Sequence, residues 1–206
     1  MPRLLIATII LAGTIAGIAA AQYFRRADPA PPELERAAMF AVTRALPEFA
    51  LIDHAGQPFG PGRLRGQWTF LFFGFVNCPD VCPTTLATLA AVRNSLADLP
   101  GDRQPAVALV SVDPDRDTPD VLAPYVTHFD RSFTGVTGTR ESIGVLTDGL
   151  GVAVMTGPAD AAGNYSVDHT AAIFLVDPEG RVAALFSGPH EAGTIARDYR
   201  RIVTAR

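Results

Sequence analysis

Buried strands and amphipathic helices alternate along most of the chain. The run Trp68–Val76 is almost unbrokenly apolar and rich in aromatic residues, which is typical of a strand buried on both faces. Leucines then recur at helical spacing between Leu86 and Leu99, which predicts an amphipathic helix. A second apolar run, Ala106–Val112, predicts another buried strand. A helix is expected to follow it, with Thr118 as N-cap and Pro119 at its first position.

The second half of the chain continues this alternation. The predicted elements are a short strand at Phe133–Val136, a helix at Arg140–Leu150, strands at Ala171–Val176 and Val182–Phe186 around a turn, and a last helix at about Glu191–Val203. A smaller hairpin is predicted around Asp53–Gly56. Strand, helix, strand and helix followed by a hairpin and a helix form an α/β pattern in one domain. This is the order of a thioredoxin-like fold.

The N-terminus has a different pattern. The 21 residues from Leu4 to Phe24 carry no charge, and as a helix they would span about 31 Å, close to the roughly 30 Å of a bilayer core. Residues 1–26 are therefore expected to form a single transmembrane anchor. A cleaved signal peptide is the competing interpretation, because residues 19–21 are all alanine. With a short tail inside, the anchor would place the large domain outside the cytoplasm.

A proline-rich segment follows the predicted anchor. Pro29, Pro31 and Pro32 favour an extended spacer without a hydrogen-bonded ladder. We expect residues 27–46 to be a linker and residues 47–206 to be the folded domain. The chain has no internal repeats that would indicate a different architecture.

Charge and cysteine content exclude several classes of protein. The formal net charge is −4, and three of the 17 basic residues lie before residue 27, so the remaining chain is more acidic still. Binding to nucleic acid needs clustered cations, so we expect no nucleic-acid partner. Two cysteines allow at most one internal disulfide, which is too little to hold a chain of this size together.

The two cysteines lie where the first buried strand passes into a helix. A helix N-terminus stabilises a thiolate, which is the form that attacks disulfides and binds soft metals. Cys78 and Cys82 are four residues apart, so on a helix they would share one face. They could bind a metal or cycle between dithiol and disulfide. The plainer alternative is two buried thiols that act as small apolar residues.

A histidine could complete such a site. His169 directly precedes the predicted strand Ala171–Val176, although an isolated histidine is more often structural. His54 and His128 are expected to be surface residues, and His190, in a loop, is an equally weak candidate. Two thiolates and an imidazole make a soft, low-coordinate site that favours copper, especially Cu(I), while zinc accepts the same ligands with a fourth.

An acidic loop follows the second buried strand. Asp113, Asp115 and Asp117 alternate with Pro114 and Arg116. Aspartates in this position commonly satisfy backbone N–H groups of a turn or of a helix start. They also suit recognition of a partner protein. We expect the capping and loop role.

Four motifs make the chain recognisable. They are FGFVNCPDVCPTTL (Phe73–Leu86), SVDPDRDTP (Ser111–Pro119), FTGVTGT (Phe133–Thr139) and YSVDHT (Tyr165–Thr170). In this order they resemble the Sco/SenC family of membrane-anchored copper chaperones, over about residues 47–186. The resemblance implies a thioredoxin-like fold of the peroxiredoxin-like variant. It also implies a copper site, for Cu(I) or Cu(II), made by Cys78, Cys82 and His169.

The resemblance also implies a location and a task. The domain would lie on the periplasmic side of the inner membrane, behind a single-pass anchor. It would help to load the binuclear copper A centre of cytochrome c oxidase subunit II, with other periplasmic copper chaperones as further partners. This role is binding and transfer of a metal, with no enzymatic turnover required.

Other functions remain open. A thiol-disulfide oxidoreductase that keeps the cysteines of the oxidase subunit reduced would use Cys78 and Cys82 as a redox-active pair, although thioredoxin-type enzymes have two residues between their cysteines where this chain has three. A peroxiredoxin-like peroxidase is disfavoured, because Leu71 and Phe75 occupy positions of its P-x-x-x-T-x-x-C motif. A scaffold for oxidase assembly would leave the candidate ligands without a role.

Overall fold

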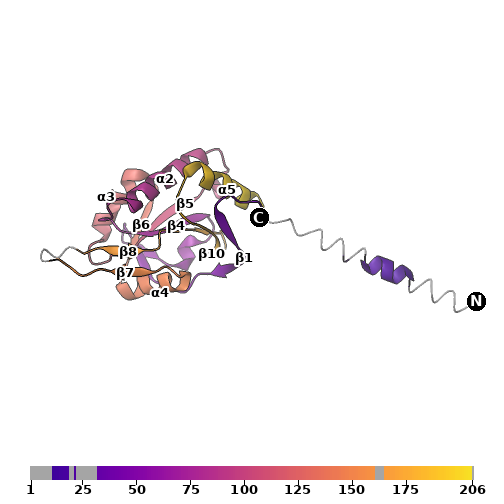
Figure 1. Cartoon of the computed structure of the whole chain (residues 1–206), viewed down its shortest axis with the longest axis horizontal. Coiled ribbons are helices and arrows are strands. Elements are labelled where there is room, and N and C mark those ends of the chain that lie inside the picture. Colours follow the sequence, from indigo (N-terminus) through magenta and orange to yellow (C-terminus); the bar gives the residue numbers. More distant parts are fainter. Residues whose placement is uncertain (1–10, 19–20, 22–31, 161–164, 206) are drawn as a thin grey trace, which may run out of the picture.

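The computed structural model describes residues 11–18, 21, 32–160 and 165–205 (Figure 1). Its strands are β1 (Ala37–Ala45), β2 (Leu51–Asp53), β3 (Pro58–Phe59), β4 (Thr69–Gly74), β5 (Ala106–Ser111), β6 (Thr134–Thr137), β7 (Val154–Thr156), β8 (Val167–His169), β9 (Ile173–Val176) and β10 (Arg181–Phe186). Besides the helical residues 11–18 and 21, its helices are α2 (Val81–Ser95), α3 (Pro119–Phe129), α4 (Arg140–Leu150) and α5 (Ala192–Thr204), with short 3-10 turns at Pro61–Leu64 and Gly101–Arg103.

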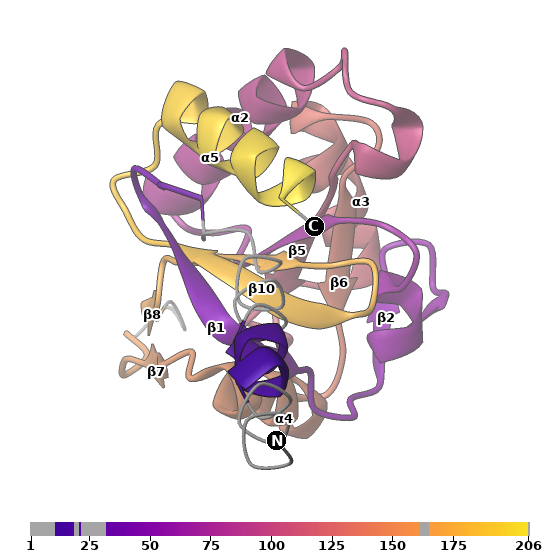
Figure 2. The same cartoon turned by 90° about the vertical axis from the view of Figure 1, so that its right-hand side faces the viewer.

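An eight-stranded sheet has the order β1-β10-β9-β4-β5-β6-β2-β3. Strands β4, β5 and β6 are parallel. On the other side of β4, β9 runs antiparallel to β4, and β10 runs antiparallel to β9. All six residues of β4 are buried, as its unbroken apolar sequence predicted. Helices α2 and α5 cover one face of the sheet and α4 covers the other (Figures 1 and 2). The α/β class and the thioredoxin-like order are confirmed.

Most predicted elements are present. Helix α4 has the bounds read from the sequence, and α2, α5, β9 and β10 differ from the expected ranges by no more than a few residues. Helix α3 has Pro119 at its first position and Thr118 at the N-cap, but the Thr118 side chain makes no capping hydrogen bond. The position of this helix start was therefore predicted correctly, and the contact expected to stabilise it was wrong.

The linker expected over residues 27–46 contains a strand. Ala37 of β1 pairs with Phe186 of β10, at the edge of the large sheet. The buried carboxylate of Asp198 in α5 accepts the backbone N–H groups of Glu35, Arg36 and Ala37 at 2.8–2.9 Å. Ordered structure thus begins before the expected boundary at residue 47. Alanines have low strand propensity, and the partners that hold β1 lie about 150 residues further along the chain.

A second strand pair was also missing from the sequence prediction. Strands β7 and β8 form a two-stranded antiparallel sheet of their own, in which Val154 is opposite His169. In Figure 1 this hairpin lies at the end of the domain, beside α4. His169 is therefore the last residue of β8 and does not directly precede β9.

The predicted anchor lies mostly outside the described residues. Of the span Leu4–Phe24, the structure describes residues 11–18 and 21, which are helical. Among the described residues, no helix is both long enough and apolar enough to cross a membrane. The anchor stays a prediction from the sequence.

Candidate functional site

The cysteines lie at the junction between β4 and α2. Cys82 is in the first turn of the helix and fully buried, whereas Cys78 lies in the preceding loop and is partly exposed. The expectation that both share one helix face was wrong, because the helix begins only at Val81. Instead, the backbone N–H of Cys82 donates to the Cys78 Sγ at 3.4 Å. A thiol thus accepts one of the N–H groups that a helix start leaves without a partner.

The environments of the two thiols differ. Burial, followed by the hydrogen bond with Cys78, raises the pKa of Cys82 far above its usual range. Burial also acts to raise the pKa of Cys78, but hydrogen bonds from the backbone of Asp80, from the Cys82 side chain and from the backbone of Cys82 and Val81 lower it overall. Cys78 is therefore the thiol that ionises first. A bound metal would have to displace the proton from Cys82.

His169 lies 87 residues after Cys82 in the sequence, yet the two side chains are in contact. Its Nε2 lies 3.6 Å from the Cys82 Sγ, and its Nδ1 lies 3.2 Å from the backbone oxygen of Thr170. A proton on Nδ1 can be donated to that oxygen, which leaves the Nε2 lone pair facing the sulfur. Burial lowers the pKa of His169 and so favours the neutral, metal-binding imidazole.

Two aromatic side chains pack against the imidazole of His169. The rings of Phe72 and Phe75 meet it nearly edge-on, at centroid distances of 6.2 and 5.9 Å. Both phenylalanines are buried and belong to or directly follow β4, the strand that leads to Cys78. The apolar run that marks β4 also supplies these contacts, but nothing in its pattern shows which rings face a histidine.

The three side chains converge without forming a finished coordination sphere. Within residues 11–18, 21, 32–160 and 165–205, no group of three or more His, Cys, Asp or Glu side chains is arranged to hold a metal ion. Cys82 nevertheless contacts both of the others, through its backbone to Cys78 and through its sulfur to His169. Two soft sulfurs and a neutral imidazole suit copper or zinc.

A cavity of about 610 Å³ opens beside these residues. Cys78, Pro79 and Asp80 line it on one side, and the segment from Tyr165 to His169 lines the other. Its walls therefore come from the loop that carries Cys78 and from the β7–β8 hairpin that carries His169, here called the histidine hairpin. A partner molecule can approach the site through this opening.

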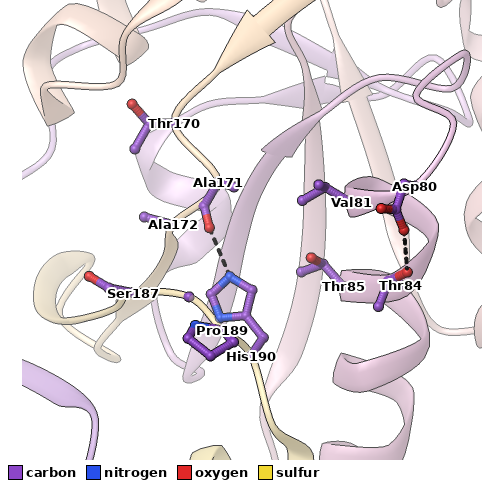
Figure 3. Close-up of a pocket in the computed structure, with 11 residues that line it drawn as sticks. Asp80, Val81, Thr84, Thr85, Thr170, Ala171, Ala172, Ser187, Pro189 and His190 are labelled. Carbon is purple, nitrogen blue, oxygen red and sulfur yellow. Dashed lines mark hydrogen bonds between the residues drawn. The ribbon is translucent and has the colours of Figure 1, made fainter.

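Figure 3 shows a second cavity next to the first, of about 480 Å³. The two share Asp80, Val81 and Ala171 in their linings. In the second, His190 Nε2 donates to the backbone oxygen of Ala171 at 2.8 Å, and the lining also includes three threonines and a serine. Neither thiol lines it, so the soft-ligand chemistry belongs to the first cavity.

The other histidines are placed away from the thiols. His54 Nδ1 accepts the backbone N–H of Gly135 at 2.9 Å, so this residue organises a turn. His128 lies on α3 beside the ring of Phe129. His190 holds the backbone at Ala171, a role that its loop position did not indicate. Of the four histidines, His169 is the one in contact with a cysteine.

Comparison with known proteins identifies the family. The SCO1/SenC family profile matches residues 39–204. The chain belongs to the SCO1/SenC family. This match includes β1 from residue 39 onward, in agreement with the earlier start of the folded part.

Similar proteins come from mitochondria and bacteria. The chain is 37% identical over 158 residues to the mitochondrial SCO2 homologue of Bos taurus, a match that covers 77% of this chain and 59% of that protein. Yeast Sco1 with copper bound is 30% identical with a TM-score of 0.74, covering 79% of this chain and 90% of that one. Bradyrhizobium japonicum ScoI with copper bound is 32% identical with a TM-score of 0.68, covering 77% and 99%.

Proposed function

We propose that this chain is a copper metallochaperone, which binds one copper ion through Cys78, Cys82 and His169. The observation that carries the proposal is the 3.6 Å approach of His169 Nε2 to the Cys82 Sγ, between residues 87 positions apart. Solved structures of two relatives contain bound copper, in yeast and in Bradyrhizobium japonicum. The chemistry of the three side chains agrees with such a ligand.

The ligand set suits reversible binding. Two thiolates favour Cu(I), and an imidazole also accepts Cu(II), so the site can take either oxidation state. Cys78 is partly exposed and lines the open cavity, whereas Cys82 is buried. A ligand of a partner protein can therefore replace Cys78 first. The copper ion can then be transferred by replacing one ligand at a time.

The acceptor we propose is the binuclear copper A centre of cytochrome c oxidase subunit II. The support is the resemblance of the four sequence motifs to the Sco/SenC family, to which the chain belongs. Other periplasmic copper chaperones are proposed as further partners, which would supply the ion. The −4 net charge supports no role with nucleic acid.

Copper titration of the full chain in detergent tests this function. We expect one Cu(I) per chain under anaerobic conditions, with the His169→Ala variant binding at least about tenfold more weakly. The His54→Ala variant is the matched control, because the His54 side chain accepts a hydrogen bond from Gly135 in a turn that does not contain the thiols. On mixing with the apo copper-binding domain of subunit II, the loaded chain should generate the absorption of the copper A centre.

Binding of no copper by the folded wild-type chain would refute the proposal. Equal binding by the wild type and His169→Ala would remove His169 from the ligand set. Copper binding without transfer would leave a copper-binding protein with a different acceptor.

A thiol-disulfide oxidoreductase is less well supported. The two thiols have the unequal pKa values that such an exchange can use. That activity, however, does not require the contact between His169 and Cys82. Copper binding uses all three side chains.

We also propose that the chain is anchored in the inner membrane through Leu4–Phe24, with the folded part on the periplasmic side. The support is the uncharged stretch of 21 residues in the sequence. In cells, the chain should remain in the membrane fraction after alkaline carbonate extraction. Release of the intact chain by carbonate would refute the anchor, and recovery of a chain cleaved near residues 19–21 would favour the signal-peptide alternative.

A further inference from the structure

The loop between β5 and α3 contacts both segments that carry the candidate ligands. Towards the cysteines, Asp117 Oδ2 accepts the backbone N–H of Val76 at 3.1 Å and the hydroxyl of Ser111 at 2.6 Å. Val76 lies two residues before Cys78, and Asp117 is fully buried. One end of the loop therefore fixes the path of the chain into the cysteine pair.

The same loop holds the segment that leads to the histidine. Tyr165 donates its hydroxyl to Asp113 Oδ1 at 2.6 Å. The guanidinium carbon of Arg116 lies 3.7 Å from the centre of the Tyr165 ring, and Arg116 Nη1 donates to the Tyr165 backbone oxygen at 3.2 Å. Arg116 Nε also pairs with Asp113. The ring, the hydroxyl group and the backbone oxygen of Tyr165 thus all contact this loop.

This anchorage adds to the packing of Val167 and Val154 against the hydrophobic core and of the His169 ring against Phe72 and Phe75. Strands β7 and β8 form a sheet separate from the large one, and a two-stranded pair is at best marginally stable alone. At its open end, Thr170 and Ala153 exchange backbone and side-chain hydrogen bonds. Towards the other end, Tyr165 is the attachment to the β5–α3 loop, and it lies four residues before His169.

Burial favours a strong interaction at this attachment. The Asp113 side chain is 1% exposed and that of Arg116 is 23% exposed, so solvent screens their contact only in part. Two residues away, the Asp115–Arg140 pair is 65% and 57% exposed, so solvent screens it more strongly. The acidic loop therefore contains one inward pair and one outward pair.

We propose that Arg116, held by Asp113, is a positioning residue that docks Tyr165 and so holds His169 over the cysteines. Its effect on copper rests on the function proposed above, whereas its effect on the hairpin does not. The acidic loop then has a use beyond capping: it aligns the two ligand-bearing segments with each other.

The test compares the full-length Arg116→Ala chain with Arg140→Ala, which removes the outward pair. In the metal-free protein, hydrogen exchange of the β7–β8 amides should become about tenfold faster in Arg116→Ala and stay unchanged in Arg140→Ala. Tyr165→Phe keeps the ring under the guanidinium and loses only the bond to Asp113, so it should show a smaller increase. Exchange in β4 and β5 reports whether the domain as a whole has loosened.

Copper binding provides the second readout. Arg116→Ala should release Cu(I) to a competing chelator about tenfold faster than wild type. In a His169→Ala background the same substitution should have almost no further effect, because the ligand it positions is gone. A role confined to general stability would cost the same in both backgrounds.

The outcomes separate the two proposals. Unchanged β7–β8 exchange in Arg116→Ala overturns the positioning role, and so does an additive effect with His169→Ala. A wild-type chain that binds no copper refutes the proposed function, while the exchange data still decide whether Arg116 docks the hairpin.

Discussion

Replacing Cys78 by serine should reduce copper affinity by more than the 10–100-fold that loss of a supporting residue around a metal ligand costs. The serine hydroxyl has nearly the shape of the thiol but does not ionise at neutral pH, so a soft thiolate ligand is lost. Cys78 is the thiol whose pKa is lowered, and its partly exposed position makes the loss of packing small. The fold should therefore survive while binding fails, as measured by chelator competition and by thermal unfolding of the same sample.

Another sulfur in the same region provides the control. Met155 lies on β7, opposite Asp168, and its side chain is 67% exposed. A thioether is also a soft ligand, so Met155→Leu tests whether any nearby sulfur supports binding. We expect wild-type affinity for Met155→Leu. An intact affinity in Cys78→Ser, or an equal loss in both variants, would contradict the ligand set.

Local sequence patterns predicted the interior of the fold well. Strand β4 is identifiable because burial on both faces demands an unbroken apolar run, and α4 because its caps and apolar stripe agree. Strand β1 was missed since its stability comes from distant partners, namely β10 and the Asp198 carboxylate. Pairing at a sheet edge and hydrogen bonds to a buried carboxylate 161–163 residues away leave no periodic signal in the strand itself.

The candidate site was predictable in its members and not in its geometry. Cys78 and Cys82 were identifiable from their place between a strand and a helix, but His169 became a strong candidate only through its V-D-H-T motif. Its position depends on the separate β7–β8 sheet and on Tyr165, whose partners lie about 50 residues earlier in the chain. The loop aspartates were predicted to shape the loop, and Asp113 and Asp117 do so from buried positions.

A close contact across β4 connects the fold to the site. A Cβ added at Gly74 would lie 2.9 Å from the Cys82 Sγ and 3.1 Å from side-chain carbons of Leu109 and Phe72. Leu109, Phe72 and Cys82 are all fully buried, so none can move into open space. The absence of a side chain at the last residue of β4 therefore makes room for the buried sulfur.

Gly74→Ala should accordingly lower the free energy of unfolding by about 1–3 kcal/mol, the usual cost of overfilling a packed core. It should also weaken copper binding, because the methyl group displaces the sulfur that His169 contacts at 3.6 Å. Gly144→Ala in α4 is the matched control: its Cβ meets nothing within 4 Å, and alanine should stabilise the helix by about 1 kcal/mol. Denaturant unfolding and chelator competition measure both effects.

The cause can be isolated by removing the sulfur. In a Cys82→Ala background, Gly74→Ala should cost less stability than it does in the wild type, since its nearest clash is gone. The remaining cost would report the contacts with Leu109 and Phe72, which persist in that background. An equal cost in both backgrounds would show that the sulfur is not the atom that requires glycine at position 74. In that case the close fit between β4 and α2 would serve the core alone, and the position of Cys82 would be set entirely by the loop that Asp117 holds.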